Sequence, residues 1–166
     1  MVTLPPFLRT LLVTDGTVTK NLEAYFWENV SVIKQGQKAV TLEQDLPLIN
    51  ARKSSEVFKR DVLLQGSESQ HIYAFAESYL RPEALQEGLK EPLIKGSIGI
   101  GELLRETGLE TYREIVDIGR EMYRPAQTKH ESFEVIYRVY VIFIGGQATI
   151  QITERFPYQL FVENTQ

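Results

Sequence analysis

The sequence predicts an α+β fold, in which an antiparallel β-sheet carries helices gathered on one side. Residues 133–144 and 147–156 are rich in β-branched and aromatic side chains and flank Gly145-Gly146, which is typical of a β-hairpin. A second antiparallel pair is predicted at residues 56–64 and 72–80, joined by a glycine-containing turn. No linker or repeat divides the chain, so residues 1–166 are predicted to form a single domain.

The other elements are predicted from local signals in chain order. Proline at a first helical position, threonine at a cap and glycine after a last turn mark where helices begin and end. These signals predict helices after Pro5-Pro6, from Thr17 or Thr19 to about Tyr25, from Pro82 towards Leu89, and over residues 97–106 before Gly108. Two short strands are predicted at residues 30–34 and 39–42 with Gly36 in the turn between them, then a loop at 43–54 and a strand at 112–118.

Composition excludes several classes of function. The chain has no cysteine, and His71 and His130 stand far apart, so we expect neither a metal site nor thiol catalysis. A net charge of −4 argues against nucleic acid as the partner. The longest strongly apolar run, residues 139–144, is far shorter than the about 20 residues of a membrane-spanning helix. We expect a cytoplasmic enzyme or binding protein without a membrane span.

Strand alternation places two charged residues on apolar faces. In the last strand, Glu154 shares a face with alanine, isoleucine and phenylalanine residues, and Arg60 shares a face with Phe58, Val62 and Leu64. A buried charge is costly unless it is paired or binds a charged ligand. One interpretation is a structural ion pair between Arg60 and Glu154. The other is a pocket in which the arginine anchors an anion and the glutamate transfers a proton.

Several segments resemble the chorismate pyruvate-lyase family, in the family's order along the chain. They are Leu11-Leu12-Val13-Thr14-Asp15-Gly16-Thr17-Val18-Thr19-Lys20, Phe58-Lys59-Arg60-Asp61-Val62, Ala76-Glu77-Ser78 with Pro82, Ile98-Gly99-Ile100-Gly101-Glu102-Leu103-Leu104, Ile118-Gly119-Arg120-Glu121 and Thr153-Glu154-Arg155-Phe156-Pro157. The resemblance covers residues from about 8 to 157 and is greatest with the cyanobacterial and plastid-related branch. It implies a six-stranded antiparallel sheet with flanking helices and a ligand cavity beneath two helical flaps.

The resemblance also implies the reaction and its residues. The family splits chorismate into 4-hydroxybenzoate and pyruvate without a cofactor, a step towards quinones such as plastoquinone. By motif, Arg60 matches the arginine that holds the ring carboxylate, and Glu154 matches the catalytic glutamate. The further candidates for substrate contact are Val18, Ile100, Thr19, Gly99 and Glu77. For Thr19 the alternative is a helix cap, for Gly99 a flexible helix start, and for Glu77 a solvent-facing side chain where proteobacterial members have arginine.

The expected chemistry fits the two charged residues. An arginine offers a planar fork for a carboxylate, and a protonated Glu154 could donate to the departing ether oxygen. A sensor domain without catalysis is the alternative, because the same fold resembles the effector-binding domain of some bacterial transcription regulators. We expect no helix-turn-helix module, for which the sequence leaves no room before Leu4 or after Gln166. A third alternative is an enzyme with another outcome on chorismate.

Overall fold

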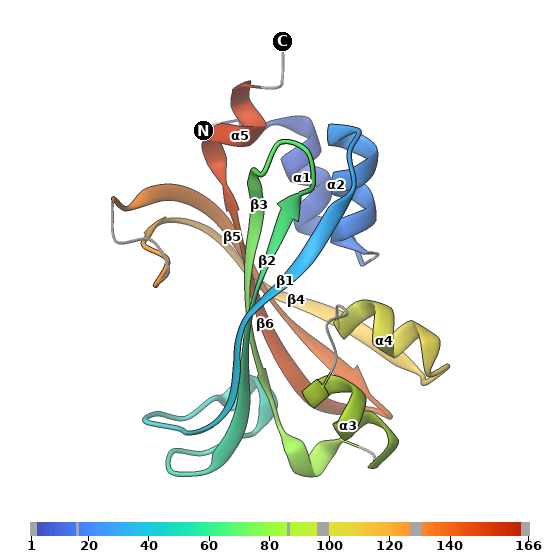
Figure 1. The fold of residues 1–166 in the computed structure, drawn as a ribbon. Helices are drawn as coiled ribbons and strands as arrows, with labels where there is room; N and C mark the ends of the chain where they lie inside the picture. The colour runs from blue at the N-terminus through green and yellow to red at the C-terminus, as the bar shows by residue number, and fades with distance from the viewer. Residues whose placement is uncertain (1–2, 16, 86, 96–99, 127–130, 164–166) are drawn as a thin grey trace.

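A six-stranded antiparallel sheet forms the centre of the molecule, with its helices on one face (Figure 1). The structure, a computed structural model, describes residues 3–15, 17–85, 87–95, 100–126 and 131–163. The strands are β1 (Val30–Thr41), β2 (Glu56–Gly66), β3 (Ile72–Leu80), β4 (Thr111–Tyr123), β5 (Phe133–Ile144) and β6 (Gln147–Pro157). They lie in the order β1-β2-β3-β6-β5-β4, and each neighbouring pair is antiparallel. The predicted fold class is confirmed.

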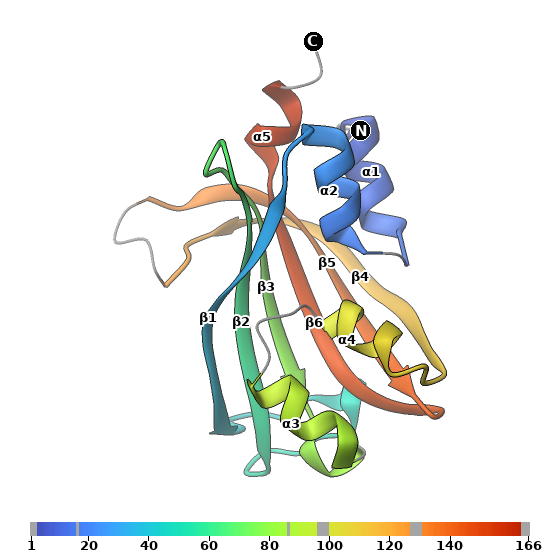
Figure 2. The ribbon, with the colours of Figure 1, turned by 45° about the vertical axis from the view of Figure 1, so that its right-hand side comes forward.

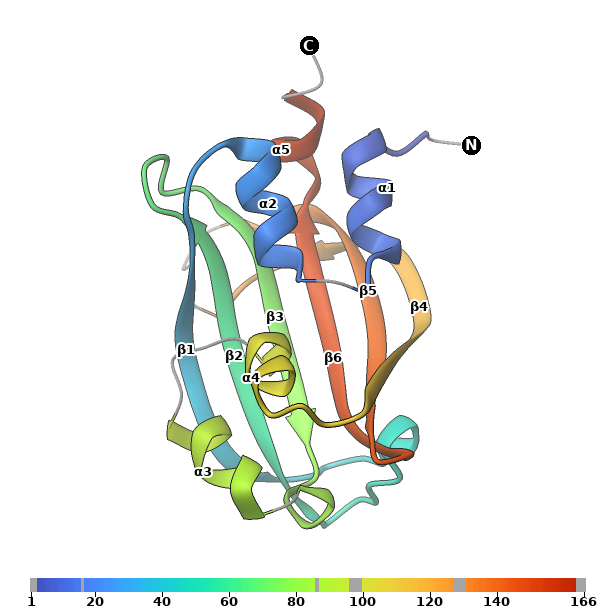
Figure 3. The same ribbon diagram turned by 90° about the vertical axis from the view of Figure 1, so that its right-hand side faces the viewer.

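The helices are α1 (Pro6–Val13), α2 (Val18–Phe26), α3 (Glu87–Lys95), α4 (Ile100–Glu106) and α5 (Tyr158–Glu163), with short 3₁₀ turns η1 (Pro47–Ile49) and η2 (Pro82–Ala84). The helices α1, α2, α4 and α3 lie along one face of the sheet, and α5 lies at the end of the sheet near the C-terminus, as Figures 2 and 3 show from two sides. In α1, Leu8, Leu11 and Leu12 are buried against the sheet, at the spacing of one helical face. None of the helices in the described ranges has the length and apolar character needed to cross a membrane.

Two apolar clusters divide the helix-covered face into an upper and a lower part. The upper cluster joins α1 and α2 to the sheet through residues such as Leu11, Leu22 and Phe156. The lower cluster joins α3 and α4 to the sheet through residues such as Leu93 and Leu104. Because each pair of helices packs on its own cluster, the middle of the sheet face is left between α2 and α4, and this is where the pocket described below lies.

The hairpin of β5 and β6 agrees with the prediction, and its turn residues explain why. Gly145 has a φ of 56° and Gly146 a φ of 78°, values that glycine adopts without the steric cost a side chain would add. Gly108, with a φ of 64°, ends α4 as predicted. Residues 112–118 belong to β4, which is longer than the segment predicted.

Two predictions of secondary structure are wrong. Residues 30–34 and 39–42 are not two strands around a turn but parts of the single strand β1, in which the register against β2 shifts between Lys34 and Gly36. A glycine inside a strand pattern can mark a bulge as well as a turn, and here the chain stays paired with β2 on both sides. The helix predicted from Pro82 is split into η2 and α3.

Candidate functional site

A pocket of about 280 Å³ lies between the sheet, the first turn of α2 and the start of α4. Its wall includes residues from all six strands and from both helices. They are Thr17, Val18, Thr19, Lys20, Glu23, Val30, Val32, Arg60, Val62, Leu64, Ala76, Ser78, Ile100, Gly101, Glu102, Arg105, Arg113, Tyr140, Ile152 and Glu154. Most of the sheet residues are apolar, so the few polar groups among them decide what the pocket can bind.

Arg60 lies on the pocket floor and is only 3% exposed. β2 sends Arg60, Val62 and Leu64 into the pocket, as the alternation predicted, and the register sets Arg60 opposite Ser78 of β3. Ser78 is buried to the same degree. Burial lowers the pKa of the Arg60 guanidinium from its ordinary value, although an arginine stays charged at any ordinary pH. The floor therefore holds a desolvated cation beside a hydroxyl group, which suits an anionic ligand.

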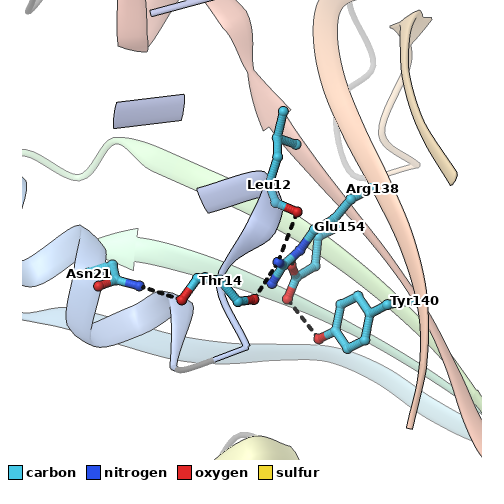
Figure 4. A network of polar contacts seen from close by, with 6 residues as sticks. All are labelled: Leu12, Thr14, Asn21, Arg138, Tyr140 and Glu154. Atoms are coloured by element: carbon cyan, nitrogen blue, oxygen red, sulfur yellow. Dashed lines mark hydrogen bonds and ion pairs between the residues drawn. The ribbon is translucent and has the colours of Figure 1, made fainter. Parts of the chain in front are cut away.

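Glu154 lies on β6, 7% exposed, and its carboxylate accepts two hydrogen bonds (Figure 4). Arg138 donates from Nε at 2.7 Å, and Tyr140 donates from its hydroxyl at 3.0 Å. The interpretation of a structural pair between Glu154 and Arg60 is wrong in its partner, because the salt bridge of Glu154 is with Arg138. Burial, and next the negative charge of the nearby Glu154 carboxylate, raises the pKa of Tyr140 well above its ordinary value. Tyr140 therefore acts as a hydrogen-bond donor.

Arg138 connects this carboxylate to the end of α1. Its Nη1 donates to the carbonyl oxygens of Thr14 at 2.7 Å and Leu12 at 3.4 Å, which belong to the last turn of that helix (Figure 4). A cation at a helix C-terminus interacts favourably with the carbonyl dipoles there. The guanidinium also lies 4.8 Å from the centre of the Tyr140 ring. Arg138 is 1% exposed, and its Nη2 has no hydrogen-bond partner within the described part of the chain.

Arg138 and Tyr140 were not among the predicted site residues, although the sequence carries a signal for them. In β5 both residues share a face with Ile136 and Ile142, so Arg138 is a charge on an apolar face just as Glu154 is. The pocket wall also contains Arg113 of β4, whose guanidinium lies 5.6 Å from the Tyr140 ring. At the rim, Lys20 pairs with Glu23 at 2.8 Å.

The structure brings most of the predicted site residues together. Val18 and Thr19 lie in the first turn of α2, Ile100 is the first residue of α4, and all three line the pocket with Arg60 and Glu154. Gly99 lies outside the described residues.

Glu77 does not join them. The register pairs it with Asp61 and Thr153, on the opposite face of the sheet from Arg60 and Glu154. There its carboxylate lies 2.9 Å from Nζ of Lys59. Its placement beside the substrate is therefore corrected, for the physical reason that neighbouring residues of a strand point to opposite faces.

Comparison with known proteins identifies a family and a fold. Residues 12–164 match the family described as chorismate pyruvate-lyase Rv2949c-like. The chorismate pyruvate-lyase of Mycobacterium leprae is 27% identical over 158 residues, which are 93% of this chain and 75% of the relative. The chorismate pyruvate-lyase of Mycobacterium tuberculosis H37Rv is 24% identical over 163 residues, covering 93% of this chain and 81% of the relative.

Solved structures with the same fold are more distant in sequence. PhnF from Mycobacterium smegmatis aligns with a TM-score of 0.68 at 12% identity, over 89% of this chain and 66% of PhnF. The effector domain of PhnF alone aligns with a TM-score of 0.65 at 13% identity, over 87% of this chain and 90% of the domain. At this identity the likeness concerns the fold only.

Proposed function

Because the chain belongs to the Rv2949c-like family of chorismate pyruvate-lyases, we propose that it eliminates pyruvate from chorismate and releases 4-hydroxybenzoate. The observation that carries the proposal is that Arg60 and Glu154 line the same pocket at two different places on its floor. Both side chains are buried. Burying a charge costs free energy unless the charge is paired within the protein or binds a charged ligand.

The sheet register supports an orientation for the substrate. Arg60, Ser78, Ile152 and Tyr140 form one row across β2, β3, β6 and β5. Three strand spacings separate the backbones at the two ends of this row, or about 14 Å. That length accommodates an arginine side chain and a six-membered ring in series. The ring carboxylate would bind Arg60 and Ser78, and the C4 end of the ring would lie near Glu154 and Tyr140.

The reaction then requires a proton to move at the Glu154 end. The C4 proton leaves, its electron pair forms the C3=C4 double bond, and the C3–O bond to the enolpyruvyl group breaks. The carboxylate of Glu154 accepts hydrogen bonds from Arg138 and Tyr140, which fix its position, and we assign it the role of accepting the C4 proton first. It would then return the proton to the enolpyruvate, which becomes pyruvate. The proton donation by Glu154 that the sequence predicts is thus the second of two proton transfers, after the removal of the C4 proton.

The predictions on domain organisation, cofactors, location and the role of the product remain proposals. We place residues 1–166 in one chorismate lyase-like domain that needs neither cofactor nor metal and binds no nucleic acid. A cytoplasmic location, a place in the cyanobacterial and plastid-related branch and a role for the product as a plastoquinone precursor also stay predictions. An enzyme with another outcome on chorismate is the nearest alternative reaction.

A sensor of small molecules is the second candidate function. The likeness to the effector domain of PhnF favours it, because the two share a fold over most of the chain. In a sensor the pocket would bind an anionic ring through Arg60 but leave it unchanged. Both a sensor and a lyase would therefore bind the anionic ring, but only a lyase would convert chorismate.

Incubation of the purified protein with chorismate, followed by ultraviolet absorbance and separation of the products, tests the proposal. We expect equal amounts of 4-hydroxybenzoate and pyruvate, and loss of both in Glu154→Gln. Arg52→Gln is a matched control, because Arg52 is exposed and lies away from the pocket. Binding of 4-hydroxybenzoate without turnover of chorismate would support the sensor instead, and neither binding nor turnover would reject both.

A further inference from the structure

Arg113 occupies the side of the pocket that lies farthest from Arg60 in the sheet. It belongs to the edge strand β4, whereas Arg60 belongs to β2, and the strands β3, β6 and β5 lie between them. The register sets Arg113 opposite Ile142, two residues along β5 from Tyr140. Its guanidinium lies 5.6 Å from the Tyr140 ring. The pocket therefore has an arginine at each side of the Glu154–Tyr140 pair.

The backbone of α4 packs directly over Arg113. A Cβ atom built on Gly101 would lie 2.6 Å from Nη2 of Arg113, which is closer than any real Cβ contact. Only a residue without a side chain at position 101 lets the guanidinium keep its place. A second pocket of about 300 Å³ shares Gly101, Arg105 and Arg113 with the first, so space continues on this side. Gly101 and Arg113 together define the boundary between the two pockets.

Chorismate carries two carboxylates, and the reaction separates them. One stays on the ring, and the other leaves with the enolpyruvyl group from C3, next to the carbon that faces Glu154. If Arg60 holds the ring carboxylate, the second carboxylate must lie beyond the Glu154–Tyr140 end of the ring. We infer that Arg113 binds this second carboxylate and that Gly101, which has no side chain, leaves the guanidinium the space to do so. This inference rests on the proposed function and extends it to the part of the substrate that departs.

Arg113 as the second anchor makes the pocket selective for a dicarboxylate. A guanidinium forms bidentate hydrogen bonds with a carboxylate, which fixes the direction of the enolpyruvyl group as well as its charge. The product 4-hydroxybenzoate lacks that group and cannot use the anchor. Removal of Arg113 must therefore affect substrate and product differently, and this difference can be measured.

The experiment compares two unreactive ligands and the substrate in Arg113→Met. The ligands are 4-hydroxybenzoate, with one carboxylate, and 3-(carboxymethoxy)benzoate, which adds an ether-linked carboxylate at the ring position of the enolpyruvyl group. We expect affinity for the dicarboxylate and kcat/KM for chorismate to fall by about 10- to 100-fold, the loss expected for one charge-assisted contact. Affinity for 4-hydroxybenzoate should stay within about twofold. Arg52→Met is the matched control.

Gly101→Ala gives an independent variant that leaves every charge in place. The added methyl group displaces the guanidinium of Arg113, so the same selective loss for the dicarboxylate is expected. Alanine favours a helix over glycine, so thermal stability should not fall. Gly88→Ala, in α3, is the control, because a Cβ atom there meets nothing within 4 Å.

Each outcome decides the inference separately from the proposed function. Equal losses for both ligands in Arg113→Met, or none for the dicarboxylate, would overturn the subsite even if chorismate is turned over. A selective loss for the dicarboxylate would support the subsite even if the wild-type protein proves to be a sensor without turnover.

Discussion

The guanidinium of Arg138 lies 2.7 Å from the carboxylate of Glu154 and, through its other side, 2.7 Å from the carbonyl oxygen of Thr14. The residue proposed to move the proton is thus held by a side chain that also caps a helix. A change at Glu154 must therefore affect stability as well as turnover, and the two effects can be separated with a second substitution.

Glu154→Gln should lower the free energy of unfolding by about 3 kcal/mol, because it leaves the buried Arg138 without its counter-charge. It should also lower turnover of chorismate by about 100-fold or more, because an amide cannot accept and return a proton. Adding Arg138→Met should restore much of the stability, since the remaining charge is removed, but not the turnover. Urea unfolding and turnover of both variants give the answer. Recovery of activity in the double variant would show that Glu154 serves only the ion pair.

Arg60→Lys should weaken binding of 4-hydroxybenzoate by about 2–3 kcal/mol, the range for a charge-assisted hydrogen bond. Lysine keeps the charge but replaces the planar fork with a single point of contact. Calorimetric titration measures the affinity, and Arg52→Lys controls for an arginine change away from the pocket. Unchanged affinity would remove Arg60 from the ligand site.

Glu28 provides a pH test of the fold that does not involve the pocket. Ser69 donates to it from both its hydroxyl and its N–H, and Tyr73 donates from its hydroxyl. The side-chain hydrogen bond from Ser69, and next that from Tyr73, lowers the pKa of Glu28 to about 2. Because the pKa is lowered in the folded state, ionised Glu28 stabilises the fold at every pH above the pKa that it has in the unfolded chain. This stabilisation is lost as the pH falls through about 2.

Glu28→Gln should therefore be less stable than the wild type at pH 7, by about 1 kcal/mol for the weakened contacts. The difference in the free energy of unfolding should shrink as the pH falls from about 5 towards 2. Urea unfolding at several pH values measures it, and turnover at pH 7 should be unchanged. A difference that stays constant over this range would show that the ionised form of Glu28 contributes nothing.

Activity should survive chelators and need no added divalent ion. The chain contains no cysteine, and within the described ranges no three His, Cys, Asp or Glu side chains gather as a metal site would require. The arginines, rather than a metal, would balance the charge of the substrate. Turnover before and after treatment with EDTA tests this. Loss of activity that a divalent ion restores would contradict it.

The sequence predicts those parts of the fold and site in which one face of a strand is clearly apolar. β6 is the best example, because its inward face is apolar except for Glu154. The same alternation in β5 places Arg138 between Ile136 and Tyr140, a charge on an apolar face that the predicted site did not include.

Other parts of the site lie beyond any local pattern. β4 is an edge strand whose side chains are mostly half-buried or exposed, so nothing in its alternation distinguishes Arg113 from Glu114. The contact between Arg138 and Leu12 joins residues 126 positions apart, and it depends on how α1 docks on the sheet. Gly36 shows the converse problem, since a glycine between two apolar segments suits a turn and a bulge equally well.

The capping of α1 by Arg138 gives the first helix an influence on catalysis at a distance. Residues of α1 do not line the pocket, yet the carbonyl oxygens at its end set the angle at which Arg138 meets Glu154. Displacement of α1 from the sheet would remove both carbonyl acceptors and leave the guanidinium with the Glu154 carboxylate and the Tyr140 ring. Because α1 also buries Leu8, Leu11 and Leu12, a bulky N-terminal fusion that displaces this helix should lower stability and turnover together, whereas the same fusion placed after α5 would leave this linkage intact.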